Sequence, residues 1–175
     1  SNVYADLTTQ DRINLNNAVV RLFNANPFAH RIIEIMRDYT VGDGVTLLSR
    51  DDKVQKLINA FWDAPANNLH ARIKSIAQDV ALFGEAAFII SNKKGDPILR
   101  IQYVSPRMIV NVVRWEYDLT QADKIGFDRS VFKNVNLSST TAGDRIAWLP
   151  VLRYDPDKKA WSGQVAFLPV NRVGE

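Results

Sequence analysis

The chain of 175 residues contains no cysteine. It can therefore form neither a disulfide nor a thiolate metal site, and this composition fits a reducing cytosol. Its longest apolar runs, such as Ala86–Ile90, fall far short of the roughly 18 residues that span a bilayer. A signal peptide, with a basic segment before an apolar one, does not open the sequence. We expect no role in a membrane and a fold stabilised by an ordinary packed core.

Histidine is scarce, and the motifs of the common enzyme classes are missing. The two histidines, His30 and His70, each fall on a predicted helix, and the sequence has no HExxH motif for zinc. It also has no G-x-S-x-G elbow and no Walker-type loop, since Gly42-Asp43-Gly44 follows a helix and lacks the Lys-Ser/Thr pair. We predict that the protein is not an enzyme, with no catalytic, cofactor-binding or metal-binding residue and no cofactor.

Glu85 is the carboxylate that helix capping and turn chemistry do not explain. It stands between a predicted helix end and an apolar strand, where an unpaired charge is costly. We predict an ion pair with a basic side chain such as Arg100 or Arg107, which would fix the junction of helix and strand. The alternative is a metal-dependent hydrolase that uses Glu85 together with scattered aspartates.

The net charge of +3 and the pI near 9.2 raise the possibility of nucleic-acid binding. Residues 1–83 carry nine basic and nine acidic residues, and residues 84–175 carry thirteen and ten. A phosphate-binding surface gathers basic residues on one face, whereas these are dispersed. The tryptophans could stack on bases, but packing in a core or interface is favoured; they are Trp62, Trp115, Trp148 and Trp161.

The first half of the chain has the spacing of four helices. Apolar residues recur along one face of each helix, and in the second helix this stripe consists of Phe28, Ile32, Ile35, Met36 and Tyr39. Residues that start or stop helices separate the four segments: Thr8 or Thr9, Asn26-Pro27, Gly42-Asp43-Gly44, Ser49 with Asp52, Ala64-Pro65, Asn67 or Asn68, and Gly84.

The second half changes to the patterns of strands. Three strands are predicted at Ala86–Ile90, Leu99–Tyr103 and Met108–Val113, with a turn at Asn92–Asp96. The pattern weakens from Trp115 to Asp144, where the polar run Ser138–Gly143 is predicted to be a loop. A final hairpin is predicted from Ala147–Tyr154 and Trp161–Leu168 around the turn Asp155–Lys159.

This order predicts an α+β fold in which N-terminal helices precede a mostly antiparallel β region. Residues 1–83 would form the helical part and residues 84–175 the β-rich part of the same domain.

Several phrases of the sequence, in this order and at these intervals, resemble tailed-bacteriophage and prophage portal proteins. In the first half they are Asn26-Pro27-Phe28-Ala29, Asp38–Val45, Phe61-Trp62 and Leu82–Phe88. In the second half they are Ser105–Ile109, Trp148-Leu149-Pro150, Leu152–Pro156 and Val170-Asn171-Arg172. The resemblance extends over about Ala18–Gly174 and is weakest from Trp115 to Ala147.

The resemblance implies a structural role and no catalysis. Portal proteins of this kind form a dodecameric ring at one capsid vertex, through which double-stranded DNA enters and leaves. The implied partners are other copies of the chain, the terminase large subunit, and the capsid, scaffold and head-tail adaptor proteins. The implied location is the virion, after assembly in the cytoplasm of the host bacterium.

Portal proteins are longer than this chain, so the resemblance implies an N-terminal fragment of the wing region, without stem, clip and crown. It assigns no DNA-binding residue. The alternative function is a nucleic-acid-binding or processing module of a mobile element.

Overall fold

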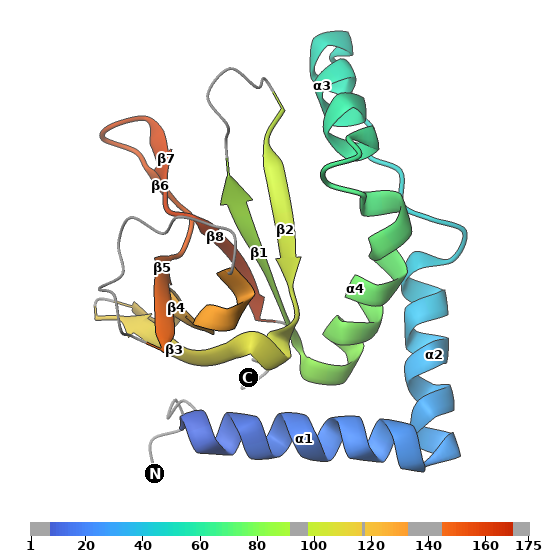
Figure 1. Ribbon diagram of the computed structural model, residues 1–175. Helices are drawn as coiled ribbons and strands as arrows, with labels where there is room; N and C mark the ends of the chain where they lie inside the picture. The colour runs from blue at the N-terminus through green and yellow to red at the C-terminus, as the bar shows by residue number, and fades with distance from the viewer. Residues whose placement is uncertain (1–7, 92–97, 117, 133–144, 170–175) are drawn as a thin grey trace.

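The computed structural model describes residues 8–91, 98–116, 118–132 and 145–169 (Figure 1). Four helices come first in the chain: α1 (Thr9–Ala25), α2 (Pro27–Val41), α3 (Asp52–Asp63) and α4 (Leu69–Phe83). The strands that follow are β1 (Glu85–Ser91), β2 (Arg100–Val104), β3 (Ile109–Trp115), β4 (Asp118–Asp128), β5 (Ile146–Pro150), β6 (Arg153–Asp155), β7 (Ala160–Ser162) and β8 (Val165–Pro169). Short 3₁₀ turns are η1 (Pro106–Met108) and η2 (Arg129–Phe132). This order confirms the predicted α+β class.

The described strands form two antiparallel sheets and a small ribbon. One sheet has the order β2-β1-β8, the second has the order β3-β4-β5, and β6 pairs with β7. In the first sheet Phe88 lies opposite Tyr103 on one side and Ala166 on the other. The central strand β1 is the apolar segment that the sequence predicts to be covered on both faces.

The hydrophobic core lies between the two sheets. It is one cluster of buried side chains from both sheets and η2: Ala87, Ile89, Val104, Ile109, Val112, Ala122, Ile125, Phe127, Phe132, Ala147, Leu149 and Val165. Burial of a large apolar side chain contributes about 1.5–3 kcal/mol relative to exposure. The sheets therefore hold most of the apolar packing, and the helices lie outside this core.

Local capping determines where the first two helices begin. Thr8 and Asp11 form a capping box, in which the Asp11 N–H donates to Thr8 Oγ1 at 3.2 Å and the Thr8 N–H donates to Asp11 Oδ2 at 3.3 Å. Asn26 Oδ1 accepts the Phe28 N–H at 2.9 Å, with Pro27 in the first turn of α2. Both starts are as predicted, because these contacts involve neighbours in sequence only.

The third helix begins later than predicted. Asp51, and not Ser49, is its N-cap residue, since Asp51 Oδ1 accepts the Lys53 N–H at 2.7 Å. The hydroxyl of Ser49 is already used, because it accepts the Asp51 N–H at 3.2 Å. The Ser49 capping prediction is therefore wrong by two residues.

The start of the fourth helix depends on two asparagines with different roles. Asn68 occupies the N-cap position in a left-handed conformation, at φ 48°, and its side chain makes no capping hydrogen bond. Asn67 is almost fully buried, and its Nδ2 donates to the carbonyls of Phe61 at 2.9 Å and Leu99 at 3.1 Å. Its Oδ1 accepts the Ile101 N–H at 3.0 Å. Asn67 thus joins the α3–α4 connection to the edge of β2.

The strand β4 lies in the segment where the sequence pattern is weak. Its pairing with β3 contains register shifts between Val113 and Arg114 and between Arg114 and Trp115. A bulge changes which face successive residues occupy, so the alternation on which a strand prediction depends is broken. The predicted turn at Asn92–Asp96 and the predicted loop at Ser138–Gly143 lie outside the described residues.

The predicted C-terminal hairpin is wrong except at its tip. Only three residue pairs join β6 and β7, the first being Arg153 with Ser162. Just beyond the tip two backbone hydrogen bonds still join the segments: the Leu152 N–H donates to the Val165 carbonyl at 2.7 Å, and the Gln164 N–H donates to the Pro150 carbonyl at 2.9 Å. The arms themselves pair elsewhere, β5 with β4 and β8 with β1. One continuous segment therefore links the two sheets, and the long arms of the hairpin pair with other strands.

Candidate assembly surface

The helical half of the chain exposes apolar side chains to an unusual extent. Within α1, α2 and α3, all of whose residues are described, Val41 is the one buried residue. The exposed apolar residues of this half are Ile13, Leu15, Leu22, Phe28, Ile32, Ile35, Met36, Tyr39, Leu47, Leu48, Val54 and Leu57. Large exposed apolar patches mark surfaces that bind other molecules.

The clearest part of this surface is the row Phe28, Ile32, Ile35, Met36 and Tyr39, which we call the α2 stripe. Residues at this spacing share one face of a helix, and the sequence predicts them as such. Phe28 is 82% exposed and Tyr39 is 90% exposed. The stripe therefore points to solvent, although an apolar helix face ordinarily packs against its own core.

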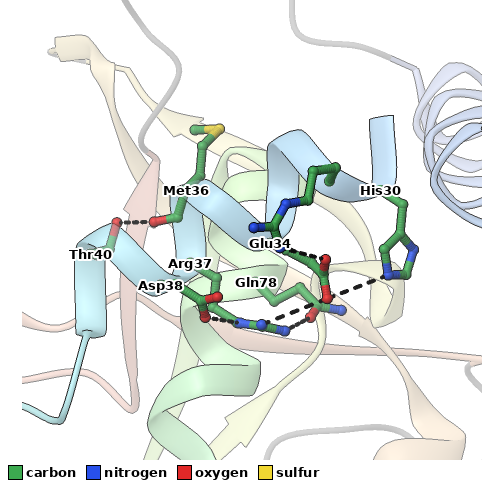
Figure 2. Close-up of polar contacts among 8 residues, drawn as sticks. His30, Glu34, Met36, Arg37, Asp38, Thr40 and Gln78 are labelled. Carbon is green, nitrogen blue, oxygen red and sulfur yellow. Dashed lines mark hydrogen bonds and ion pairs between the residues drawn. The ribbon is translucent and has the colours of Figure 1, made fainter. Parts of the chain in front are cut away.

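The opposite face of α2 packs against α4 and combines the apolar Ile33 and Val41 with the polar Glu34 and Arg37. Arg37 donates through Nη1 to Gln78 Oε1 of α4 at 3.1 Å, and through Nε to Asp38 Oδ1 at 2.8 Å. Figure 2 shows the Met36 side chain directed away from this contact. The hydrogen bond between Arg37 and Asp38 raises the pKa of Arg37 and lowers the pKa of Asp38. Polar contacts hold α2 in place and leave its apolar face free.

Glu34 is the centre of a second set of polar contacts on this face. Its carboxylate lies 3.3 Å from Arg31 Nη1, 3.7 Å from His30 Nε2 and 3.9 Å from Arg37 Nη2 (Figure 2). Such partly exposed pairs on one helix each contribute about 0.3–0.5 kcal/mol. They fix the orientation of side chains more than they stabilise the fold.

Glu85 forms the predicted ion pair, but with a different partner. Its Oε1 accepts a hydrogen bond from Arg12 Nη2 of α1, and the Glu85 and Arg12 side chains are 13% and 14% exposed. Burial raises the pKa of Glu85, and the Arg12 charge offsets part of this rise. The predicted partners Arg100 and Arg107 were wrong, because Arg12 lies 73 positions away in sequence. The pair fastens α1 to the start of β1.

Both histidines make structural contacts on helices. The His30 ring stacks on Phe23 with the ring centroids 4.3 Å apart. His70 Nδ1 accepts the indole N–H of Trp62 at 3.3 Å, and its Nε2 lies 2.9 Å from Asp63 Oδ1. These contacts connect α1 to α2 and α3 to α4.

A groove among the described residues lies between α4 and β2. It has a volume of about 580 Å³ and is lined by Ala66, Arg72, Ser75, Ser91, Arg100, Ile101, Gln102 and Tyr103. The Tyr103 hydroxyl donates to Asp79 Oδ2 at 2.7 Å. Burial is the main cause that raises the pKa of Tyr103, and this hydrogen bond raises it further. That contact joins α4 to the sheet.

The described residues include neither a cluster of metal ligands nor a helix suited to a membrane. They contain no group of three or more histidine, aspartate or glutamate residues arranged to hold a metal ion. Among the described helices, none has both the length and the apolar character needed to cross a bilayer.

Comparison with known families gives one match to most of the chain. The sequence model of a family described as phage portal protein, SPP1 Gp6-like, matches residues 8–136. The matched part begins at the capping residue of α1, contains the α2 stripe and continues past β4 and η2. No curated protein matches the chain at a significant level.

Proposed function

Because this chain belongs to the SPP1 Gp6-like phage portal proteins, we propose that it is a structural subunit of a portal ring at one vertex of a bacteriophage capsid. The family is structural and non-enzymatic in general, and its members assemble as oligomers with other capsid components. In the proposed role the ring is a conduit for DNA during packaging and ejection.

The observation that supports assembly most directly is the exposed apolar surface of α1, α2 and α3. A helix that presents Phe28 and Tyr39 to water gains free energy when another protein surface covers them. In a ring of identical subunits, each subunit supplies that cover for its neighbour. The polar contacts of Arg37 and Glu34 orient the helix so that this face remains available.

The proposed partners follow from the same role. They are other copies of the chain in a dodecameric ring, the terminase large subunit, capsid and scaffold proteins, and head-tail adaptor proteins, with double-stranded DNA passing through the channel. Assembly would occur in the cytoplasm of the host bacterium. Residues 1–83 and 84–175 would form the helical and β-rich parts of one wing domain.

The native mass of the portal protein that contains this chain tests the proposal. We expect a large closed oligomer by light scattering or native mass spectrometry, with the same mass over a range of protein concentrations. A monomer at every concentration and ionic strength would contradict the ring.

A second experiment distinguishes the ring subunit from the alternative, a nucleic-acid-binding module. It measures DNA binding by the isolated chain over a series of salt concentrations. A nucleic-acid-binding module would show affinity whose logarithm falls linearly with the logarithm of salt concentration. The ring subunit has no need of such affinity on its wing, and we expect weak binding without sequence preference. Tight, salt-dependent binding by a monomeric protein would support the alternative instead.

A further inference from the structure

The α2 stripe has the spacing of a helix-packing seam as well as a general apolar character. Four of its members, Phe28, Ile32, Ile35 and Tyr39, are separated by four, three and four residues. This is the a/d spacing with which one helix packs along another. The partner that fits such a row is an α-helix, because a strand or loop does not repeat side chains at this interval.

The same chain carries a second seam, on α1. Leu15, Ala18, Leu22 and Ala25 are separated by three, four and three residues, and all four are exposed. The α1 seam is about as long as the α2 seam, since they cover eleven and twelve residues at roughly 1.5 Å each. Its alanines leave space where large side chains of a facing helix can enter.

These two seams cannot cover each other within one copy of the chain. Helices α1 and α2 meet end to end at Asn26, and α1 lies across the foot of α2 (Figure 1). On α1, residues such as Arg12 and Phe23 face the chain's own sheet and helices. The exposed row Leu15, Ala18, Leu22 and Ala25 remains free for a different molecule.

We propose that the α2 seam of one subunit packs against the α1 seam of its neighbour in the ring. The proposal rests on the proposed function, because it names the partner of the same surface. Two different surfaces of one chain then form the contact, and such a heterologous contact closes into a ring when its rotation permits. A row that paired with itself would stop at a dimer.

Cysteine cross-linking tests the pairing directly, since residues 1–175 contribute no cysteine and any cysteine elsewhere in the full portal protein is first replaced by serine. Ala18→Cys and Ile35→Cys are combined in the full portal protein, which is treated with a flexible bismaleimide and analysed on a denaturing gel. We expect a ladder of covalent multimers from the double variant. Each single variant should give none, because residues 18 and 35 face each other only across subunits.

The matched control combines Ala18→Cys with Trp161→Cys, an exposed position on β7 outside both seams. This pair should give no ladder. A ladder from Ile35→Cys alone would show that α2 pairs with itself and would overturn the proposal. A cross-link from Ile35→Cys to a different protein would also overturn it.

A dilution series gives an independent measurement. Replacing Ile32 and Tyr39 by serine removes two large side chains from the seam, and both are exposed, so the fold should be unaffected. We expect subunit association at least about tenfold weaker, whereas Trp161→Ser should dissociate as the unchanged protein does. If the protein forms a ring and the seam variants neither weaken it nor cross-link, the seam pairing is wrong and the proposed function stands. If no ring forms at all, both fail.

Discussion

Glu85 carries a charge in a place where burial opposes ionisation. Its pKa is raised above the ordinary value of 4.5, so the folded protein holds a proton at Glu85 more tightly than the unfolded chain does. The free energy that this group contributes is therefore present below pH 4.5 and is lost as the pH rises through the raised pKa. The Arg12 guanidinium limits this loss.

Glu85→Gln should remove this pH dependence. The difference in unfolding free energy between the unchanged protein and the variant is expected to fall as the pH increases from below 4.5. Denaturant unfolding at several pH values measures it, and other titrating groups cancel in the difference. A difference that rises with pH would mean that the ion pair outweighs burial.

Arg12→Met should cost more than Glu85→Gln at neutral pH. The change leaves the Glu85 carboxylate buried without its partner, and such losses are about 3 kcal/mol. It should also move the pH-dependent window upward, because the Arg12 charge is what lowers the pKa of Glu85. Equal losses of stability in the two variants would show that solvent reaches Glu85.

Asn67 makes three hydrogen bonds that hold β2 to the helices. Asn67→Ala should cost about 3 kcal/mol of unfolding free energy, because the Ile101 N–H and the carbonyls of Phe61 and Leu99 lose their partner. Asn67→Asp is the informative comparison. Its carboxylate still accepts the Ile101 N–H but faces two carbonyl oxygens, so we expect a larger loss. A cost below about 1 kcal/mol for Asn67→Ala would indicate replacement by water.

At the scale of elements, the crossing of two segments near β7 depends on Gly163. Its φ of 107° disfavours other residues, and an added Cβ would lie 2.4 Å from the Val151 carbonyl oxygen. This close passage lets the chain leave the β6–β7 ribbon and enter the first sheet as β8.

Gly163→Ala should therefore destabilise the fold by about 3 kcal/mol, from backbone strain and overlap together. Gly44→Ala is the matched control, since Gly44 also has a positive φ, 135°, but an added Cβ there meets no atom within 4 Å. We expect about 1 kcal/mol for the control. Thermal or denaturant unfolding of both variants gives the comparison. Similar losses of unfolding free energy in the two variants would show that the close approach of Val151 to Gly163 does not matter for stability.

The helix starts at Thr8 and Asn26 could be predicted because each depends on residues within one turn. The arms of the last hairpin could not, because the pairing of β5 with β4 and of β8 with β1 joins segments far apart in sequence. The same holds for Glu85, whose ion pair was predicted while its partner Arg12 was not.

For the candidate site, the sequence predicts which residues form the α2 stripe but not whether the stripe faces the core or the solvent. A periodic apolar row such as Phe28, Ile32 and Tyr39 is the same whether the helix faces its own core or another molecule. The orientation of α2 depends on contacts such as the hydrogen bond between Arg37 and Gln78, which lie 41 positions apart in sequence. The family resemblance was confirmed by the match over residues 8–136, which contains the five phrases from Asn26-Pro27-Phe28-Ala29 to Ser105–Ile109; the three later phrases lie outside it.

At the scale of the whole molecule, packing is unequal between the two halves. The buried cluster belongs to the sheets, whereas α1–α3 have Val41 as their one buried residue among those described. Segments with few buried contacts open locally at a lower free energy than the core. We expect backbone amides of α2 to exchange with solvent deuterium much faster than those of β4 in the isolated chain.

In the ring, amide exchange in α2 should slow by about tenfold or more, because assembly adds the missing contacts. Mass spectrometry of peptides after exchange measures both states. The β4 amides provide the internal control, since their burial does not depend on a neighbour. Equal exchange of α2 in the free and assembled states would indicate that α2 is not covered by assembly.

The exposure of the α2 stripe also has a consequence for the lifetime of an unassembled subunit. A solitary chain displays Phe28, Ile32 and Tyr39 on a helix with one buried residue. Exposed apolar side chains and easily opened segments are the features by which chaperones and proteases select substrates. When a neighbouring subunit covers the helix, its apolar side chains are buried and the helix gains stabilising contacts. Subunits left unassembled would therefore be degraded before assembled ones.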